Sequence, residues 1–204
     1  MTKSRIEAFS DGVIAVAITL LALDLHVPSA DSASSLAHNL GEQWPNYAAY
    51  AVSFLTIGII WINHHAMLRR LVAVDHAILM LNLVLLMTIV VLPFSTALLA
   101  EYLKTGEGDH LAAAVYGGSF LVMSLAFLTM HRQVLARREL VDTRITEEHK
   151  RWLLRRNTVG LLPYAVATAG AIVSPYVTLG ICTFVAVFYA LPATTPDPPE
   201  AIGT

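Results

Sequence analysis

The side chains best suited to chemistry stand at the start of the first apolar segment, RIEAFSDGVIAVAITLLALDL, at positions 5–25. A plain membrane anchor would carry aliphatic residues where this chain has Arg5, Ser10 and Asp11. A carboxylate within a membrane helix is costly, and it is normally kept only where it faces protein or water and has a partner. Asp11 could therefore carry a proton, face an ion path or hold neighbouring helices together through hydrogen bonds.

Partners for Asp11 are predicted on two other apolar segments, at the same depth in the membrane. The segment that ends WINHHAMLRR supplies four of them and the next segment supplies one. They are Trp61, Asn63, His64, His65 and Asn82. Arg5, six residues before Asp11, is better placed at the membrane interface than in an ion pair within the helix. We therefore expect Asp11 to find its donors on neighbouring helices.

The adjacent histidines His64 and His65 raise the question of a metal or haem site. Successive residues on a helix point about 100° apart, so both rings do not easily face one ion. The other histidines stand at predicted helix ends or in loops, and no set of His and Glu lies deep in a helix. We expect no metal and no cofactor, and assign one of the pair to a hydrogen bond with Asp11 or Ser10.

Catalysis and nucleic-acid binding are not indicated. The chain has no nucleophile elbow, no HExxH, no phosphate-binding glycine loop and no second carboxylate to pair with Asp11 at membrane depth. Its single cysteine, Cys182, builds no disulfide or thiolate metal site within one chain. The sequence therefore predicts a protein that is not an enzyme.

The elements that must position these side chains are membrane helices. The 204 residues are 56% hydrophobic and 14% charged, with a mean hydropathy of +0.62, which is too apolar for a water-soluble domain of this length. A membrane helix needs about 20 apolar residues, and six segments approach this: 6–25, 47–68, 75–102, 110–133, 158–173 and 176–191. The prediction is an all-α bundle of six transmembrane helices.

Two prolines divide the apolar segments. Pro93 should kink the third helix, with Ser95 or Thr96 satisfying the freed backbone groups. The fifth and sixth helices form one apolar stretch that is divided near Ser174–Pro175. A single kinked or re-entrant segment is the alternative there.

The distribution of charge predicts the orientation, because basic residues in short loops stay in the cytoplasm. With six helices, every Lys and Arg except Lys104 falls on one side: Lys3, Arg5, Arg69, Arg70, Arg132, Arg137, Arg138, Arg144, Lys150, Arg151, Arg155 and Arg156. Both termini are then cytoplasmic, in a bacterial-type inner membrane. Residues 1–192 form the membrane domain, and the proline-rich tail 193–204 is expected to be disordered.

An alternative for the N-terminus is a secretory signal peptide, since a basic start, an apolar run and PSADSA follow one another. Glu7 and Asp11 oppose it, because they stand where a signal peptide is basic or neutral.

On a helical wheel the first segment has two neighbouring stripes. Val13, Val16, Leu20 and Leu23 form a branched apolar stripe, and Gly12, Ala15, Thr19 and Ala22 form a stripe of small residues. Small residues let membrane helices approach closely, so the helix could simply pack in the core. Alternatively, the branched stripe could face its copies around an axis as a hydrophobic constriction. The spacing does not choose between these interpretations.

The first three segments resemble the bacterial branch of the transmembrane-protein-175 potassium channels. The hallmark of that branch is Arg, three residues, then Phe-Ser-Asp, which Arg5, Phe9, Ser10 and Asp11 match in place. The resemblance continues through FLTIGIIWINHHAML and LNLVLLMTIVVLPFSTALLAEY. Over the last three segments it extends only to hydropathy.

This resemblance implies a potassium-permeable channel, built as a homotetramer of six-helix subunits whose first helices line a central pore. It implies a hydrophobic constriction at Val16, Leu20 and Leu23, with Thr19 also near the axis, in place of a carbonyl filter. In that family the first position of the constriction, where each subunit contributes one side chain to a ring, is commonly isoleucine. Val16 is one methylene smaller. The resemblance also implies a structural network: Arg5, Phe9, Ser10, Asp11, Trp61, His64, His65 and Asn82.

Two other functions stay open from the residues alone. Asp11 and the neighbouring histidines could form the path of a proton-coupled transporter. The bundle could also be a membrane subunit that transports nothing or binds a cofactor. The residues themselves do not set the oligomeric state, since a six-helix chain could equally dimerise.

Overall fold

The computed structural model of the chain describes residues 3–28, 35–137, 140 and 147–191, which form helices and their connections. The elements in chain order are α1 (Lys3–Leu20), the 3-10 helix η1 (Leu21–Asp24), α2 (Leu36–Glu42), α3 (Trp44–Arg69), α4 (His76–Val90), α5 (Leu92–Thr105), α6 (Asp109–Ala136), α7 (Glu147–Val159), α8 (Leu161–Gly170) and α9 (Pro175–Ala190). The prediction of an all-α fold is confirmed for these residues.

Four helical stretches within the described residues are long and apolar enough to cross a membrane: Lys3–Asp24, Trp44–Arg69, His76–Thr105 and Asp109–Ala136. Each corresponds, within one to three residues at either end, to one of the first four predicted segments. The fifth predicted segment begins at the end of α7 and continues through α8 after a turn at Gly160. The sixth corresponds to α9, which is apolar but shorter than the four long stretches.

The third apolar segment is interrupted at Pro93, as its sequence predicts. Proline cannot donate a backbone hydrogen bond and its ring clashes with the preceding turn, so α4 ends at Val90 and α5 begins at Leu92. The hydroxyls of Ser95 and Thr96 both donate to the Leu92 carbonyl, at 3.0 and 2.7 Å.

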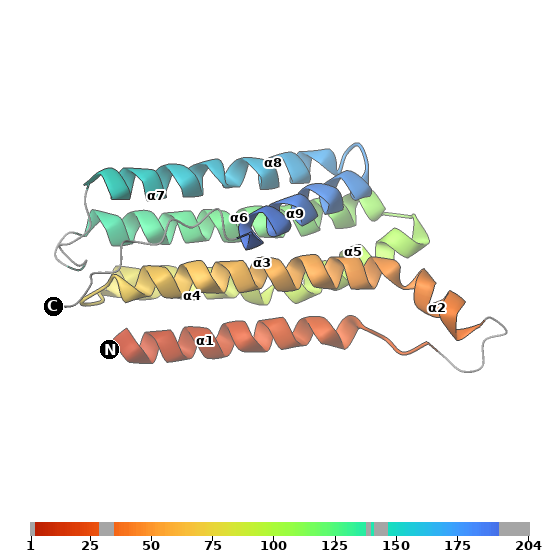
Figure 1. Cartoon of the computed structure of the whole chain (residues 1–204), viewed down its shortest axis with the longest axis horizontal. Helices are drawn as coiled ribbons and strands as arrows, with labels where there is room; N and C mark the ends of the chain where they lie inside the picture. The colour runs from red at the N-terminus through yellow and green to blue at the C-terminus, as the bar shows by residue number, and fades with distance from the viewer. Residues whose placement is uncertain (1–2, 29–34, 138–139, 141–146, 192–204) are drawn as a thin grey trace.

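Two helices, rather than one kinked helix, occupy the last apolar stretch. Ser174 caps α9 by accepting a hydrogen bond from the backbone N–H of Tyr176 at 3.3 Å, and Pro175 occupies the first helical position, where its missing N–H costs nothing. The chain turns back between α8 and α9, and the two helices pack on each other (Figure 1).

The helices lie side by side along one long axis (Figure 1), with α1 at one edge and α7 and α8 at the opposite edge. Lys3 donates to the Arg69 carbonyl at 3.0 Å, and Arg137 lies 3.6 Å from the Asp75 carboxylate. These contacts join the start of α1, the end of α3, the start of α4 and the end of α6. The described Lys and Arg residues other than Lys104 lie in the first turn of α1, at the end of α3, in or just after the last turns of α6, or on α7. These segments lie toward this end of the bundle (Figure 1).

Small residues bring the later helices close together. A Cβ added to Gly117 on α6 would lie 3.2 Å from the Thr168 backbone of α8, and one added to Gly170 would lie 2.9 Å from Val177 Cγ1 of α9. Such close approach is a usual way to pack helices in lipid, where burial of apolar surface gives little driving force.

Some predictions lie outside the described residues. They concern the tail 193–204 and the positions of Arg138 and Arg144 in the basic loop 134–156.

Candidate functional site

A buried hydrogen-bonded group joins α1, α3 and α4 near the basic end of the bundle. Asn82 Nδ2 donates to Ser10 Oγ at 3.0 Å, and the Ser10 hydroxyl faces Asn82 Oδ1 at 3.3 Å. Asn82 Oδ1 also lies 2.8 Å from Nε2 of His64. This places the proton of a neutral His64 on Nε2, because an amide oxygen can only accept. All three side chains are buried, so each meets its polar requirement inside the protein.

Asp11 bonds to a different partner. The indole N–H of Trp61 donates to Asp11 Oδ1 at 2.8 Å, which makes a second link between α1 and α3. The His65 ring lies against Trp61, with 6.2 Å between ring centroids, so among the described residues it supports the indole that donates to Asp11. Asn63 instead accepts from Arg156 of α7 at 3.1 Å.

Arg5 and Phe9 are not brought into these contacts. Both are exposed in the single chain, and Phe9 keeps 49% of its surface accessible. No described residue forms a hydrogen bond or ion pair with the Arg5 side chain. Of the eight residues of the predicted network, five form hydrogen bonds that join α1, α3 and α4: Ser10, Asp11, Trp61, His64 and Asn82. His65 lies against Trp61, and Arg5 and Phe9 are exposed.

The face of α1 that packs on its own chain is neither of the two stripes seen in the sequence. Its buried residues are Ile6, Ser10, Ile14 and Ala17, and the buried Leu21 of η1 continues the same side. Their spacing of four, four, three and four residues forms one side of a helix, and this side contacts α3 and α4. The small-residue stripe lies elsewhere, and a Cβ added to Gly12 would meet nothing within 4 Å.

The residues of the predicted constriction lie together on the uncovered side of α1 and of η1, which continues it. Val16, Leu20 and Leu23 are 58%, 38% and 71% exposed, although all three are large and apolar. Thr19 is exposed between them and donates its hydroxyl to the Val16 carbonyl at 2.8 Å. The hydroxyl hydrogen is thereby used, while the oxygen keeps lone pairs directed away from the helix backbone.

A second polar group, in the middle of the bundle, has no counterpart among the predicted site residues. Ser53 of α3 lies 2.8 Å from the Thr96 hydroxyl and 3.1 Å from the Tyr116 hydroxyl, and all three are buried. Beside them Ser119 donates to Ser95 at 2.8 Å. These hydroxyls tie α3, α5 and α6 together, so they belong to the packing of the bundle.

Within the described residues, no group of three or more His, Cys, Asp or Glu side chains is arranged to hold a metal ion. His64 is engaged with Asn82, and His65 faces an indole ring. The arrangement around Asp11 therefore offers hydrogen bonds between helices and, beside them, an exposed apolar helix face.

Comparison with known proteins identifies the family. A protein of Streptomyces collinus named a potassium channel is 45% identical over 187 residues, which cover 92% of this chain and 91% of that protein. The chain belongs to the TMEM175 family. A potassium channel of Chamaesiphon minutus is 36% identical over 189 residues, covering 92% of this chain and 93% of its own. The family model described as "Endosomal/lysosomal potassium channel TMEM175" matches residues 5–93.

The fold agrees with this family. A crystal structure described as a lysosomal potassium-selective channel TMEM175 homolog from Chamaesiphon minutus superimposes with a TM-score of 0.84 at 35% identity, covering 95% of this chain and 98% of that one. A chicken relative named "Endosomal/lysosomal proton channel TMEM175" is 36% identical over 123 residues, which are 56% of this chain and 25% of that protein. The resemblance noted in the sequence is thus confirmed, and the chain is a multi-pass membrane protein of an ion-channel family.

Proposed function

We propose that this chain forms a potassium-permeable cation channel whose pore is lined by α1 helices from several copies, four in the assembly that the family resemblance implies. The exposed apolar face of α1 carries this proposal. Val16, Leu20 and Leu23 stay uncovered by the other described helices of their own chain, whereas the opposite side of α1 is fully packed. A second copy of the same face around an axis would cover them.

The constriction acts through dehydration. The side chains of Val16, Leu20 and Leu23 offer a passing ion no ligands to replace its water. An ion passes only if the ring is wide enough for its remaining water shell, so small changes in ring width control passage. Thr19 lies one turn from Val16 and supplies the oxygen nearest to this apolar stretch, where a cation could exchange one water ligand.

The relatives that match most of this chain support potassium, and not protons, as the conducted ion. The two bacterial relatives named potassium channels each match 92% of this chain, whereas the chicken relative named a proton channel matches 56%. The proton path through Asp11 is the second candidate. The carboxylate of Asp11 bonds to Trp61, which donates one hydrogen bond and cannot pass a proton on as a carboxylate or imidazole can.

The polar residues at the start of α1 then have a structural role. The Ser10–Asn82–His64 group and the Asp11–Trp61 bond fix the rotation and height of α1 against α3 and α4, and thereby aim the constriction residues at the axis. Arg5 and Phe9, which are exposed in the single chain, are suited to contacts between copies.

The membrane arrangement belongs to the same proposal. Six apolar segments within residues 1–192 cross a bacterial inner membrane, with both termini and the tail 193–204 in the cytoplasm. The gathering of basic residues at the end of the bundle where α1 begins supports this orientation.

Potassium flux into liposomes that contain the purified protein tests the proposal. Sodium is the competing ion, and Leu20→Ser is compared with wild type and with Leu83→Ser, the same change at an exposed position of α4. Leu20→Ser should raise the flux or weaken the preference for potassium, and Leu83→Ser should leave both unchanged. Unchanged flux and preference in Leu20→Ser would contradict the pore assignment.

A pH-sensitive dye in the same liposomes tests the second candidate. A flux that follows a pH gradient and disappears in Asp11→Asn, while the protein stays assembled, would favour a proton-coupled transporter over the channel.

A further inference from the structure

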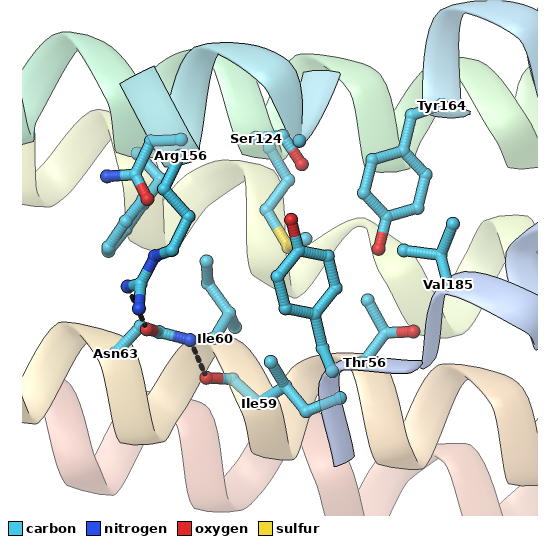
Figure 2. Close-up of a pocket in the computed structure, with 13 residues that line it drawn as sticks. Thr56, Ile59, Ile60, Asn63, Ser124, Arg156, Tyr164 and Val185 are labelled. Carbon is cyan, nitrogen blue, oxygen red and sulfur yellow. Dashed lines mark hydrogen bonds between the residues drawn. The ribbon is translucent and has the colours of Figure 1, made fainter. Parts of the chain in front are cut away.

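A pocket unrelated to α1 opens between α3, α6, the junction of α7 and α8, and α9. Its empty volume, including the open mouth, is about 600 Å³. Figure 2 shows Arg156 and Asn63 at one end, and Tyr164 and Val185 at the other. The pocket lies where α9 ends: Tyr189, in its last turn, lines the pocket, and α3 continues toward the basic end.

The two ends of the pocket differ in chemistry. Buried apolar and aromatic side chains line the rest of it, namely Ile60, Met123, Phe127, Tyr164 and Val185, with Tyr164 and Val185 at the end away from Arg156 (Figure 2). Thr56, also there, donates its hydroxyl to the Val52 carbonyl at 2.8 Å and so has no hydrogen to offer a ligand. This end suits a hydrocarbon chain.

The other end carries a positive charge. Arg156 is half-buried, donates to Asn63 Oδ1 at 3.1 Å and lies over the Trp152 ring, 4.9 Å from its centroid. Neither contact neutralises its charge, and no carboxylate of the described residues lies within 4 Å of Arg156 or of Arg70. Burial lowers the pKa of the Arg70 guanidinium, and the positive charge of Arg156 lowers it further.

The position of this charge matches the membrane interface. Trp152 beside Arg156 is of the residue type enriched where lipid headgroups lie, and the segment RWLLRR is basic. Basic pockets between membrane helices on the cytoplasmic side are a known mode of binding anionic headgroups. A soluble anion would use the charged end alone and leave the apolar interior empty.

We propose that this pocket binds an anionic phospholipid, with the phosphate paired to Arg156 and an acyl chain lying along Phe127, Tyr164 and Val185. Asn157, which lines the pocket next to Arg156 and is hydrogen-bonded to His131, helps to fix the polar end. A lipid held there joins α3, α6, α7 and α9 through one molecule.

Native mass spectrometry of the purified protein tests this lipid site. Delipidated protein is titrated with phosphatidylglycerol or with phosphatidylcholine, which has the same chains but no net charge. Phosphatidylglycerol should be retained more strongly, and Arg156→Gln should weaken its retention by roughly tenfold, as the loss of one charge-assisted contact implies. Arg155→Gln is the matched control, because this neighbouring arginine is exposed and does not line the pocket.

A second variant separates the apolar end from the charge. Ser124 lines the pocket and is half-buried, so Ser124→Phe should fill the space and weaken binding while Arg156 remains. Soluble glycerol phosphate should not compete at concentrations where the lipid binds. Variants must elute as wild type does in size-exclusion chromatography.

Photo-crosslinking locates the lipid. Phosphatidylglycerol with a diazirine in its acyl chain should label peptides that contain Phe127 or Val185. Equal retention of the two lipids in wild type, equal retention in Arg155→Gln and Arg156→Gln, or labelling confined to other helices would each overturn the proposal. Competition by glycerol phosphate would overturn it in favour of a free phosphate site.

Discussion

The indole nitrogen of Trp61 lies 2.8 Å from the Asp11 carboxylate, and this bond joins α3 to α1 one residue away from the buried Ser10. Ser10 is hydrogen-bonded to Asn82 of α4 at 3.0 Å. Adjacent residues of α1 therefore contact two different helices. Because successive residues on a helix point in different directions, the pair fixes the rotation of α1 as well as its height.

Trp61→Phe should destabilise the folded protein by about 1 kcal/mol, the usual net contribution of one partly exposed hydrogen bond. A smaller aromatic ring remains beside His65, and the donor to Asp11 is lost. The loss of ring size is shared with the control variant. Thermal unfolding in detergent measures the effect. Trp44→Phe is the control, because Trp44 stacks on Tyr176 through its ring alone, with 6.1 Å between centroids. Equal midpoints in the two variants would contradict a role for the Asp11 bond.

Asn82→Leu should be more damaging, because it leaves both Ser10 and His64 buried without their partner. Each such unpaired group costs about 1–3 kcal/mol. Ser10→Ala should cost less, since Asn82 keeps its bond to His64. The combination Asn82→Leu, His64→Leu and Ser10→Ala should recover part of the loss, because no buried polar group remains unpaired. Chemical or thermal unfolding of the three proteins measures this, and a triple variant less stable than Asn82→Leu would contradict it.

The sequence predicts the helices well and their faces poorly. The polar residues Ser10, Asp11 and Asn82 indicate contacts between helices, since lipid offers them no partners. The apolar faces of α1 carry no such information, because lipid and protein interior are equally apolar. Hydrophobic spacing therefore did not separate the buried side, with Ile14 and Leu21, from the uncovered one.

The hydroxyl group around Ser53, Thr96 and Tyr116 escaped prediction for a related reason. A Ser or Thr within a membrane helix can bond to a carbonyl of its own helix, as Thr96 does with Leu92 at 2.7 Å, so its presence alone indicates no partner on another helix. The pocket near Arg156 depends on where α9 ends relative to α3. That depends on packing, which one sequence does not give.

Gly117→Ala and Gly118→Ala should have opposite effects, although the glycines are adjacent on α6. A methyl group at Gly117 would lie 3.2 Å from backbone atoms of Thr168, whereas one at Gly118 would lie 3.8 Å from a Thr168 methyl, an ordinary contact. Gly117→Ala should cost about 1–3 kcal/mol by overpacking, and Gly118→Ala should be neutral or stabilise by about 0.5–1 kcal/mol through helix propensity. Unfolding midpoints measured in one detergent compare the two variants, and equal losses would contradict the close packing of α6 on α8.

Val16→Ile tests the width of the proposed constriction. Val16 is 58% exposed on the uncovered side of α1, so an added methylene meets no residue of the same chain's buried core and would narrow only a ring formed by several copies. Conductance should fall, because an ion must lose more of its water to pass a narrower apolar ring. The preference for potassium over sodium should rise, because removing water from sodium costs more free energy.

Single-channel current and the reversal potential with potassium on one side and sodium on the other measure both effects of Val16→Ile. Val84→Ile, the same change at an exposed position of α4, serves as the control and should alter neither. If Val16→Ile leaves the current and the reversal potential at their wild-type values, the first ring does not limit permeation. The constriction would then have to be narrowest at Leu20 or Leu23, where Leu20→Ser would still raise the flux.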